Sequence, residues 1–358
     1  MIPMPPQKAM FFETLPSQKV RCGLCAHRCV ILPNETGFCR VRQNIDGVLY
    51  SLNYGFVVSE TIDPIEKKPL YHFHPGATTY SLGTIGCNFK CSYCQNHRLA
   101  QPADSVYLSL QTGDCLQYGE FVTPEEVVKR ALFLESKIIS FTYNEPTVWY
   151  EFVYETSVLA KENGLCVVWV TNGSITPEAL KTAAPYIDAY CVDIKSFSND
   201  FYNTISSAEL EPVLTSVLTA KNLGIHVETV TLLIPNQNDS VHELEKLAEW
   251  IFSHLGSETP VHLTAFKPHF KMKDVSETPV SLLERARAVF LTAGLEYVYI
   301  GNAVSEYQNT YCPDCHALLA YRRLLFGEAV NLKRKNDDYF CSYCNRKIPF
   351  ICSEDDVF

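Results

Sequence analysis

Clustered cysteines carry the most specific chemical information in the sequence. The chain has 358 residues and 15 cysteines, and most of these cysteines stand in three short motifs. A reducing compartment keeps thiols free, so cysteine clusters in an intracellular chain indicate metal sites more than disulfides. The number and spacing of the thiols in each motif then decide which kind of metal centre it can form.

The central motif is CNFKCSYC, which places Cys87, Cys91 and Cys94 on one tight loop. The next cysteine, Cys115, follows after twenty further residues and belongs to no comparable motif. A closed structural site needs a fourth ligand, so three thiols indicate a metal centre with one position left for an exogenous group. An incomplete zinc knuckle is the alternative.

The N-terminal motif supplies four thiols within eighteen residues, at Cys22, Cys25, Cys29 and Cys39. A segment with proline, asparagine and glycine between the third and fourth thiols favours a turn that brings the chain back. Four soft thiolates can close around one tetrahedral ion, and we expect a structural zinc ion here. An iron–sulfur cluster with the same ligands is the alternative, because sulfur suits both metals and the sequence does not choose between them.

The C-terminal motif consists of two CxxC knuckles separated by twenty-five residues, Cys312 with Cys315 and Cys341 with Cys344. This pattern is typical of a zinc ribbon, in which each knuckle presents two thiolates to one ion. Basic residues gather between and after the knuckles. We interpret them as a solvated charged surface, with a docking face for RNA or an acidic protein as the alternative.

The elements that must position these motifs alternate between short strands and helices from residue 78 to residue 301, which predicts βα units and a parallel sheet. We expect helices that include 124–134, with Thr123 as N-cap, and 240–255. Six such units and one closing strand predict an α/β fold, a partial (βα)6 TIM-like barrel whose sites lie at the carboxyl ends of the strands. The expected strands are 78–86, 137–143, 166–171, 189–194, 226–234, 261–266 and 297–300.

Polar side chains on or after these strands are the candidates for binding a ligand. Asp193 and Lys195 share one face of the fourth strand because side chains alternate, and a structural ion pair is the alternative role. Glu145 can accept charge-assisted hydrogen bonds from an ammonium group. The further candidates are Asn144 beside it, Thr171 and Asn172 after the third strand, Glu228 in the fifth, and His262 in the sixth, where a satisfied core histidine is the alternative. We expect residues 63–76, DPIEKKPLYHFHPG, to form a loop over the central cluster.

The central CxxxCxxC loop, with Tyr93 before its last cysteine, resembles that of the radical SAM superfamily. The resemblance implies that Cys87, Cys91 and Cys94 bind a [4Fe-4S] cluster whose fourth iron chelates S-adenosylmethionine (SAM). Reduction of SAM would then yield a 5'-deoxyadenosyl radical that removes hydrogen from a substrate. The resemblance implies SAM contacts for Glu145, with Asn144 beside it, and for Asp193 and Lys195, although only Glu145 and Pro146 match the Gly-Gly-Glu-Pro stretch of activating enzymes. From their positions alone, Tyr93, Thr171, Asn172, Glu228 and His262 are further candidates for SAM contacts.

The order of motifs along almost the whole chain is similar to the radical SAM component of the AmmeMemoRadiSam system, which is related to pyruvate formate-lyase activating enzyme. The stretches that carry this similarity are DPIEKKPLYHFHPG, GCNFKCSYCQN, TYNEP, TNG, LLIPNQND and YIGN. It implies an enzyme that modifies or activates a protein or peptide partner, with flavodoxin or ferredoxin as electron donor. Modification of a small metabolite or an RNA base is one alternative. A non-enzymatic metal-binding adaptor is another.

Composition limits the remaining classes. With 47% hydrophobic residues the chain can bury a large core, yet its apolar runs fall short of the ~18 residues that indicate a membrane span. The first twenty residues lack a signal-peptide pattern, so we expect a cytoplasmic protein. A net charge of -10 argues against general nucleic-acid binding. We expect a cysteine-rich region with its lead-in loop at 1–76, the barrel at 77–304 and the zinc ribbon at 305–358.

Overall fold

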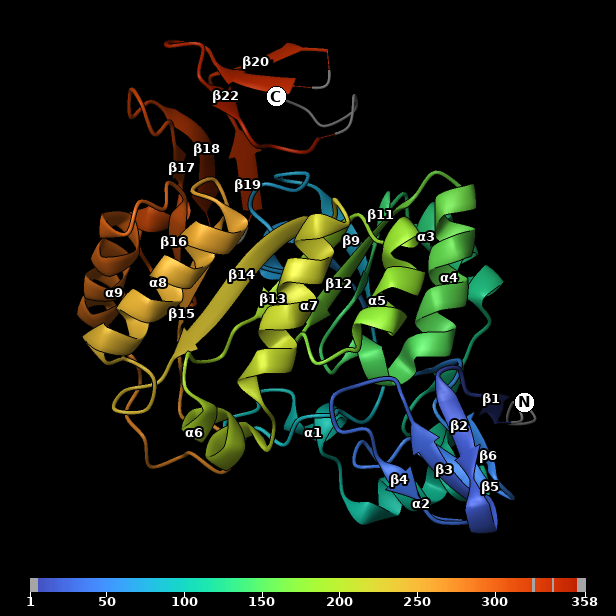
Figure 1. Cartoon of the computed structure of the whole chain (residues 1–358). Coiled ribbons are helices and arrows are strands. Elements are labelled where there is room, and N and C mark those ends of the chain that lie inside the picture. Colours follow the sequence, from blue (N-terminus) through green and yellow to red (C-terminus); the bar gives the residue numbers. More distant parts are fainter. Residues whose placement is uncertain (1–5, 324–325, 337, 353–358) are drawn as a thin grey trace.

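The computed structural model describes residues 6–323, 326–336 and 338–352, and its centre is an eight-stranded sheet (Figure 1). Seven strands are parallel, and the eighth, β8, pairs antiparallel with β9 at one edge. The strands, in spatial order, are β16 (Val298–Gly301), β15 (Val261–Ala265), β14 (His226–Leu233), β13 (Ala189–Asp193), β12 (Cys166–Thr171), β11 (Ile138–Phe141), β9 (Thr78–Gly83) and β8 (Ser59–Pro64).

All seven strands predicted from the sequence are present, with ends that shift by three residues at most. Their register is that of a regular parallel sheet, as in the pairing of Val192 on β13 with Thr229 on β14. The antiparallel strand β8 was not predicted. The central parallel sheet is therefore confirmed, and its closure into a partial barrel stays a prediction.

Helices follow the parallel strands and cover one face of the sheet (Figure 1). The predicted cap at Thr123 is present, because its hydroxyl accepts from the N–H of Glu126 at 3.2 Å while the Glu126 carboxylate accepts from the N–H of Thr123 at 2.7 Å. None of the described helices is long and apolar enough to cross a membrane. The helices are α1 (His97–Ala100), α2 (Asp104–Thr112), α3 (Pro124–Phe133), α4 (Tyr150–Glu162), α5 (Pro177–Ala183), α6 (Asn199–Phe201), α7 (Leu210–Asn222), α8 (Val241–Leu255) and α9 (Val280–Thr292).

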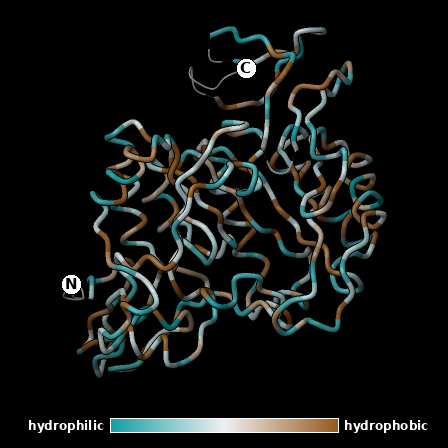
Figure 2. The backbone as a smooth tube through the Cα atoms, turned by 180° about the vertical axis from the view of Figure 1, so that it is seen from behind, coloured by the Kyte–Doolittle hydropathy of each residue, from teal (hydrophilic) through white to brown (hydrophobic). Residues whose placement is uncertain are grey.

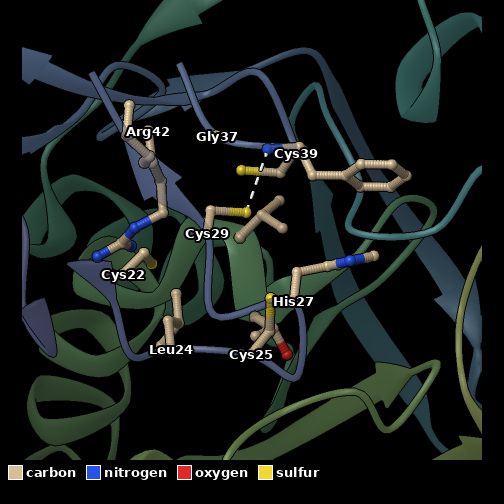
Figure 3. Close-up of a pocket in the computed structure, with 12 residues that line it drawn as sticks. Cys22, Leu24, Cys25, His27, Cys29, Gly37, Cys39 and Arg42 are labelled. Atoms are coloured by element: carbon tan, nitrogen blue, oxygen red, sulfur yellow. Dashed lines mark hydrogen bonds between the residues drawn. The ribbon is translucent and has the colours of Figure 1, made fainter. Parts of the chain in front are cut away.

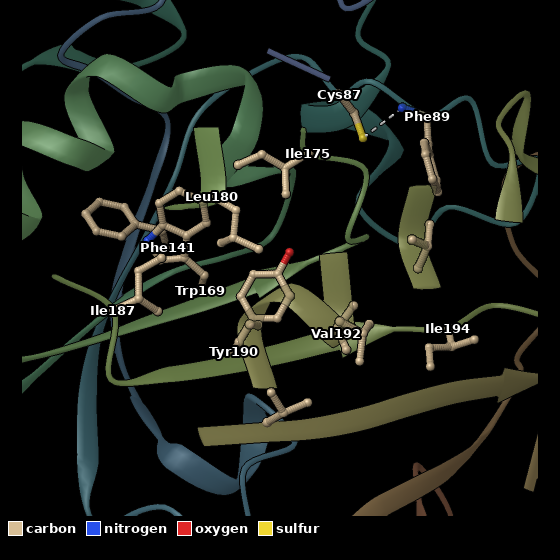
Figure 4. Close-up of a cluster of buried hydrophobic side chains, with 14 of the residues drawn as sticks. Cys87, Phe89, Phe141, Trp169, Ile175, Leu180, Ile187, Tyr190, Val192 and Ile194 are labelled. Carbon is tan, nitrogen blue, oxygen red and sulfur yellow. Dashed lines mark hydrogen bonds between the residues drawn. The ribbon is translucent and has the colours of Figure 1, made fainter. Parts of the chain in front are cut away.

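The main core lies between the sheet and these helices. Figure 4 shows Phe141, Trp169 and Tyr190, from three neighbouring strands, beside Leu180 of α5. Figure 2, seen from behind, shows hydrophobic segments running through this body. The opposite face of the strands carries a second apolar cluster, in which Ile65, Leu70 and Phe73 of the segment 65–76 pack against Ile138, Val168, Ala189, Cys191 and Val230. The segment therefore fills the inner face of the sheet instead of lying only over the central cluster as expected.

The N-terminal region lies at the carboxyl ends of the parallel strands, beside α1 and α2 (Figure 1). It contacts the loop that follows β9, where a Cβ added to Gly86 would lie 3.0 Å from the carbonyl oxygen of Cys39. Two small antiparallel sheets form this region, one from β1 (Gln7–Lys8), β6 (Val48–Ser51) and β5 (Arg42–Ile45), the other from β2 (Phe12–Leu15), β3 (Lys19–Cys22) and β4 (Val30–Ile31), while β7 (Phe56–Val57) pairs with β10 (Glu120–Phe121).

The C-terminal region lies at the opposite end of the sheet (Figure 1). It is fixed there by the segment 65–76, since the N–H of His74 donates to the carbonyl of Ile351 at 2.6 Å and Arg322 donates to the carbonyl of Tyr71 at 2.6 Å. Its strands are β17 (Thr310–Tyr311), β18 (Leu318–Arg323), β19 (Phe326–Ala329), β20 (Leu332–Lys335), β21 (Asp338–Cys341) and β22 (Lys347–Ile348).

Part of the expected basic surface of this region is used internally. Arg322 is buried, and Arg346 forms ion pairs with Glu258, Glu296 and Asp314. Buried or paired cations are not available to phosphates, so the structure gives less support to RNA docking than the sequence alone.

Candidate functional site

A cavity of about 570 Å³ opens at the carboxyl ends of the parallel strands. This volume lies in the range of pockets that hold cofactor-sized ligands. The three central thiols form part of its wall, and strand tips form the rest. Its lining includes Lys67, Lys68, Cys87, Phe89, Cys91, Tyr93, Cys94, Thr142, Asn144, Val170, Thr171, Asn172, Asp193, Lys195, Val230, Leu232, Thr264 and Asn302.

Backbone hydrogen bonds to neighbouring segments fix the central loop, which we define as the loop that carries Cys87, Cys91 and Cys94. It begins at Gly86, whose φ of +91° suits glycine and whose N–H donates to the carbonyl of Leu99 at 2.9 Å. At the other side, the N–H of Ser92 donates to the carbonyl of Ile205 at 2.9 Å. The loop conformation therefore does not depend on a bound metal alone.

The three thiols fit the donor set of a [4Fe-4S] cluster. Burial, with the nearby Glu145 and Cys91, raises the pKa of Cys87 well above its ordinary value, and burial beside Cys91 raises the pKa of Cys94 to about 12. Buried thiols with raised pKa values stay protonated unless a cation takes the negative charge, and iron does so through soft sulfur ligands. These three cysteines face one cavity that leaves room for a further ligand.

Asn172 lies directly against this loop. Its amide donates to the side-chain oxygen of Asn88 at 2.8 Å and stands 3.7 Å from the sulfur of Cys87. Asn144 braces the same loop, since its amide donates to the carbonyl of Gly86 at 2.9 Å. Both predicted residues line the cavity, and each also positions a ligand of the expected cluster.

Glu145 lies behind the wall of the cavity instead of on it. The side chain is fully buried and accepts hydrogen bonds from the hydroxyl of Thr171 at 2.8 Å, from the N–H of Asn172 at 2.8 Å and from the N–H of Thr147 at 2.9 Å. Burial raises its pKa, although these hydrogen bonds act in the opposite direction. The expected direct contact with SAM is therefore not supported, because the carboxylate oxygens already have partners and instead position Thr171 and Asn172.

Asp193 and Lys195 form the charged side of the cavity. Their side chains meet at 3.0 Å, as the alternation along the strand predicts, and the Lys195 ammonium lies 5.9 Å from the centre of the Tyr93 ring. Asp193 keeps 40% of its side chain exposed. Burial would lower the pKa of Lys195, but Asp193 and Tyr93 outweigh it and raise the pKa well above the ordinary value. The cavity thus holds a fixed cation beside an accessible carboxylate.

Lys68 is a cavity residue that sequence reasoning missed. Lys68 is a buried residue of the segment 65–76. Its ammonium donates to the carboxylate of Asp63 at 2.6 Å and lies 4.7 Å from the ring centre of Tyr143. Burial lowers the pKa of Lys68 to about 8, although Asp63 acts in the opposite direction. Burial would raise the pKa of Asp63, but hydrogen bonds from Lys67, Lys68 and Tyr143 lower it to about 2. The proline-rich motif pointed to this segment, but not to this side chain.

Glu228 and His262 lie near the amino ends of β14 and β15, away from the cavity. Glu228 accepts from His262 at 2.7 Å and from the N–H groups of Tyr71 and His72 at 2.9 and 2.8 Å. The predicted SAM contacts of these two residues are therefore not supported, because both are buried in a network that holds the segment 65–76. Thr264, two residues after His262, lines the cavity instead.

Comparisons with known proteins identify the family. Residues 82–251 match the model of the radical SAM superfamily. An uncharacterised protein of Methanocaldococcus jannaschii is 46% identical over 347 residues, which cover 96% of this chain and 99% of that relative. The chain belongs to the radical SAM superfamily. It is an enzyme of the radical SAM class, and the adaptor alternative loses its basis.

More distant radical SAM relatives are activating enzymes. The pyruvate formate-lyase-activating enzyme of Clostridium pasteurianum is 25% identical over 175 residues, 46% of this chain and 66% of that protein. A putative glycyl-radical enzyme activating enzyme of Methanocaldococcus jannaschii is 25% identical over 186 residues, 50% of this chain and 70% of that protein. A domain of pyruvate-formate lyase-activating enzyme from Bacteroides vulgatus superposes with a TM-score of 0.41 and 16% identity, covering 46% of this chain and 98% of that domain.

The radical SAM chain carries its two further cysteine groups at opposite ends of the sheet. The C-terminal quartet, Cys312, Cys315, Cys341 and Cys344, has all four sulfurs within 4.8 Å of one another, with pairs at 3.4 and 3.6 Å. This spacing suits one tetrahedral ion. The quartet can therefore bind a metal, and zinc stays the prediction. The N-terminal quartet, Cys22, Cys25, Cys29 and Cys39, lines a separate enclosed cavity (Figure 3).

Proposed function

We propose that this enzyme reductively cleaves SAM at a [4Fe-4S] cluster held by Cys87, Cys91 and Cys94, and that the resulting 5'-deoxyadenosyl radical abstracts hydrogen from a protein or peptide. The observation that carries the proposal is one cavity that combines three thiols, two of them buried, with a fixed cation and an accessible carboxylate. When bound, the cluster supplies the electron that the sulfonium of SAM accepts.

The chain's own residues bind and orient SAM under this proposal. The ammonium groups of Lys195 and Lys68 suit its carboxylate, and the exposed carboxylate of Asp193 suits its amino group. Thr171 and Asn172 lie where hydroxyl and amide groups can contact the ribose. The apolar residues of the same wall, which include Phe89, Val170, Val230 and Leu232, exclude water from the reacting carbon.

The activating-enzyme relatives support a protein or peptide as the substrate. We further propose that the enzyme is of the AmmeMemoRadiSam type, that flavodoxin or ferredoxin supplies its electrons, and that the chain divides into regions 1–76, 77–304 and 305–358. The Tyr93 side chain, which is buried beside Lys195, serves in this proposal to orient the Lys195 ammonium.

The test is oxygen-free reconstitution with iron and sulfide, followed by dithionite and SAM. We expect about four irons and four sulfides that depend on the central loop, together with 5'-deoxyadenosine as a product. Deuterated candidate proteins should transfer deuterium into the 5'-deoxyadenosine. A central loop that binds only a single ion, fully ligated by sulfur, would overturn the proposal.

Replacing Lys195 with methionine should weaken SAM binding. The change removes a charge-assisted hydrogen bond worth roughly 1.5–3 kcal/mol, which corresponds to a dissociation constant about 10 to 100 times larger. Equilibrium titration of the reconstituted enzyme with SAM measures it. Lys161→Met is the matched control, because the Lys161 side chain is about one third exposed, pairs with Asp188 and lies outside the cavity. Equal weakening in both variants would contradict a special role for Lys195.

SAM affinity should also depend on pH through Lys68. Because burial lowers the pKa of Lys68 to about 8, its ammonium loses its proton as the pH rises through that value, while a carboxylate ligand keeps its charge. The affinity measured by titration between pH 7 and pH 9.5 should therefore fall above pH 8. Lys68→Arg keeps the positive charge over this range and should flatten the profile. An unchanged profile in this variant would rule Lys68 out as the cause.

A further inference from the structure

The thiols of the N-terminal quartet line one small cavity (Figure 3), and its other lining residues include Leu24, Ile31 and Val148. A single zinc ion bonds to its four sulfurs at about 2.3 Å, which brings those sulfurs close to contact with one another. An iron–sulfur cubane instead takes one thiolate at each of four separate corners, so its ligands surround a larger space. The spacing of the sulfurs, and not the volume of the cavity, which is about 20 Å³, is therefore what distinguishes a cluster from a single ion here.

The rest of the chain provides an internal comparison. The C-terminal quartet has its sulfurs within 4.8 Å of one another, as one ion requires. Among the described residues, neither the N-terminal quartet nor the central loop forms a group with that spacing. The N-terminal quartet thus shares the wider arrangement of the loop whose superfamily binds a cluster, and differs from the quartet that suits zinc.

Arg42 supplies a second, independent observation. Its side chain is 2% exposed, lines this cavity and pairs with Glu151 through both terminal nitrogens at 3.0 Å. Its Nε–H, however, has no hydrogen-bond partner within the part of the chain that the structure describes. A buried donor without an acceptor is energetically unfavourable. The inorganic sulfides of a cluster are acceptors, and hydrogen bonds to them are a general feature of such sites.

The N-terminal quartet also adjoins the central loop directly. The ring Nε2 of His27 is 2.7 Å from the carbonyl oxygen of Asn88, which follows Cys87. On the other side, the carbonyl of Cys39 packs so closely on Gly86 that a Cβ there would be 3.0 Å away. A residue on each side of Cys87 therefore touches a residue of the N-terminal metal-binding segment.

We propose that the N-terminal quartet holds a [4Fe-4S] cluster that passes electrons to the cluster of the central loop. In this transfer the N-terminal cluster is oxidised by one electron and the central cluster is reduced by one electron, with no bond or proton transferred. A ferredoxin- or flavodoxin-class protein supplies the electron. The presence of the cluster is independent of the proposed function, whereas the electron transfer rests on it. This proposal selects the iron–sulfur cluster that the sequence left as the alternative to zinc at this site.

Metal analysis tests the site without using activity. The triple variant Cys87→Ala/Cys91→Ala/Cys94→Ala, reconstituted without oxygen, should keep about four irons and four sulfides, and the unaltered enzyme should hold about twice as many. A triple variant that contains no iron but a second equivalent of zinc overturns the proposal. Cys115→Ala replaces a buried cysteine outside the three motifs and should leave the iron content unchanged.

A complementary variant keeps the test valid if the triple variant does not fold. Cys25→Ala/Cys29→Ala should lose half of the iron of the unaltered enzyme, and an unchanged iron content overturns the site. This variant should still form 5'-deoxyadenosine with dithionite, because a small reductant can reach the central loop directly. If it binds iron at the central loop but forms no product, the proposed function fails while the N-terminal cluster stands on the triple variant.

Electron paramagnetic resonance tests the transfer between the two sites. Two reduced clusters in adjoining loops should show a magnetic interaction, so the spectrum of the fully reduced enzyme should be broader than the sum of the spectra of the two variants. A spectrum equal to that sum would overturn the electron transfer and leave the N-terminal cluster in place. With a ferredoxin-class donor, Cys25→Ala/Cys29→Ala should also reduce the central cluster more slowly than the unaltered enzyme.

Discussion

Cys91→Ala should abolish the formation of 5'-deoxyadenosine by the reconstituted, dithionite-reduced enzyme without unfolding the chain. The thiol is one of three that can hold the central cluster, and a loop with two thiols cannot replace it. The backbone bonds on either side of it remain, since Lys90 and Ser92 donate to the carbonyls of Ser206 and Ile205 at 2.8 and 2.9 Å. Product analysis by liquid chromatography and thermal unfolding give the two readouts.

The matched control is Cys315→Ala at the opposite end of the sheet (Figure 1). Loss of one of four ligands should release the metal and destabilise the C-terminal region, because metal binding there contributes folding energy. Cleavage should stay within roughly a factor of two, since none of the C-terminal quartet lines the cavity of the central loop. Equal loss of product in both variants, with both chains folded, would contradict this division between catalytic and structural cysteines.

The strands and helices of this enzyme could be predicted from the sequence more accurately than which polar side chains line the cavity. The parallel strands were predictable because short apolar runs alternate with helical segments that carry their own caps, as at Thr123. The contact between Asp193 and Lys195 was predictable for a similar local reason, since residues two apart on a strand share a face. Both predictions need only neighbours along the chain.

Glu145, Glu228 and His262 show what local patterns do not contain. A polar side chain on the inner face of the sheet can bind a ligand if it lies near the carboxyl end of its strand, or another segment of the chain if it lies near the amino end. Tertiary packing, which local sequence patterns do not contain, determines which of these partners it has. Glu145 accepts from Thr171 and Asn172 at the end of β12 and from the N–H of Thr147 after β11. Lys68 was missed for the converse reason, because its place in the cavity depends on how the segment 65–76 fills the inner face of the sheet.

Glu228→Ala should lower the free energy of unfolding by about 3–5 kcal/mol, because it removes the fully buried acceptor of this network. The carboxylate accepts from the N–H groups of Tyr71 and His72 and from the rings of His226 and His262, at 2.7 to 3.0 Å. All four donors would lose this partner at once. Urea unfolding measures the change. Glu249→Ala on the exposed face of α8 is the control and should change stability by less than about 0.5 kcal/mol.

The same carboxylate should make stability depend on acid pH. Burial alone would raise the pKa of Glu228, but the hydrogen bonds and charges of His226 and His262 outweigh it and lower the pKa well below 4.5. A carboxyl group with a lowered pKa contributes stability above its ordinary pKa, and that contribution is lost as the pH falls toward the lower folded value. Glu228→Gln should lack this part of the acid dependence yet bind SAM with unchanged affinity at neutral pH. A tenfold loss of SAM affinity in Glu228→Gln, with stability unchanged, would mean that this carboxylate serves the ligand and not the segment 65–76.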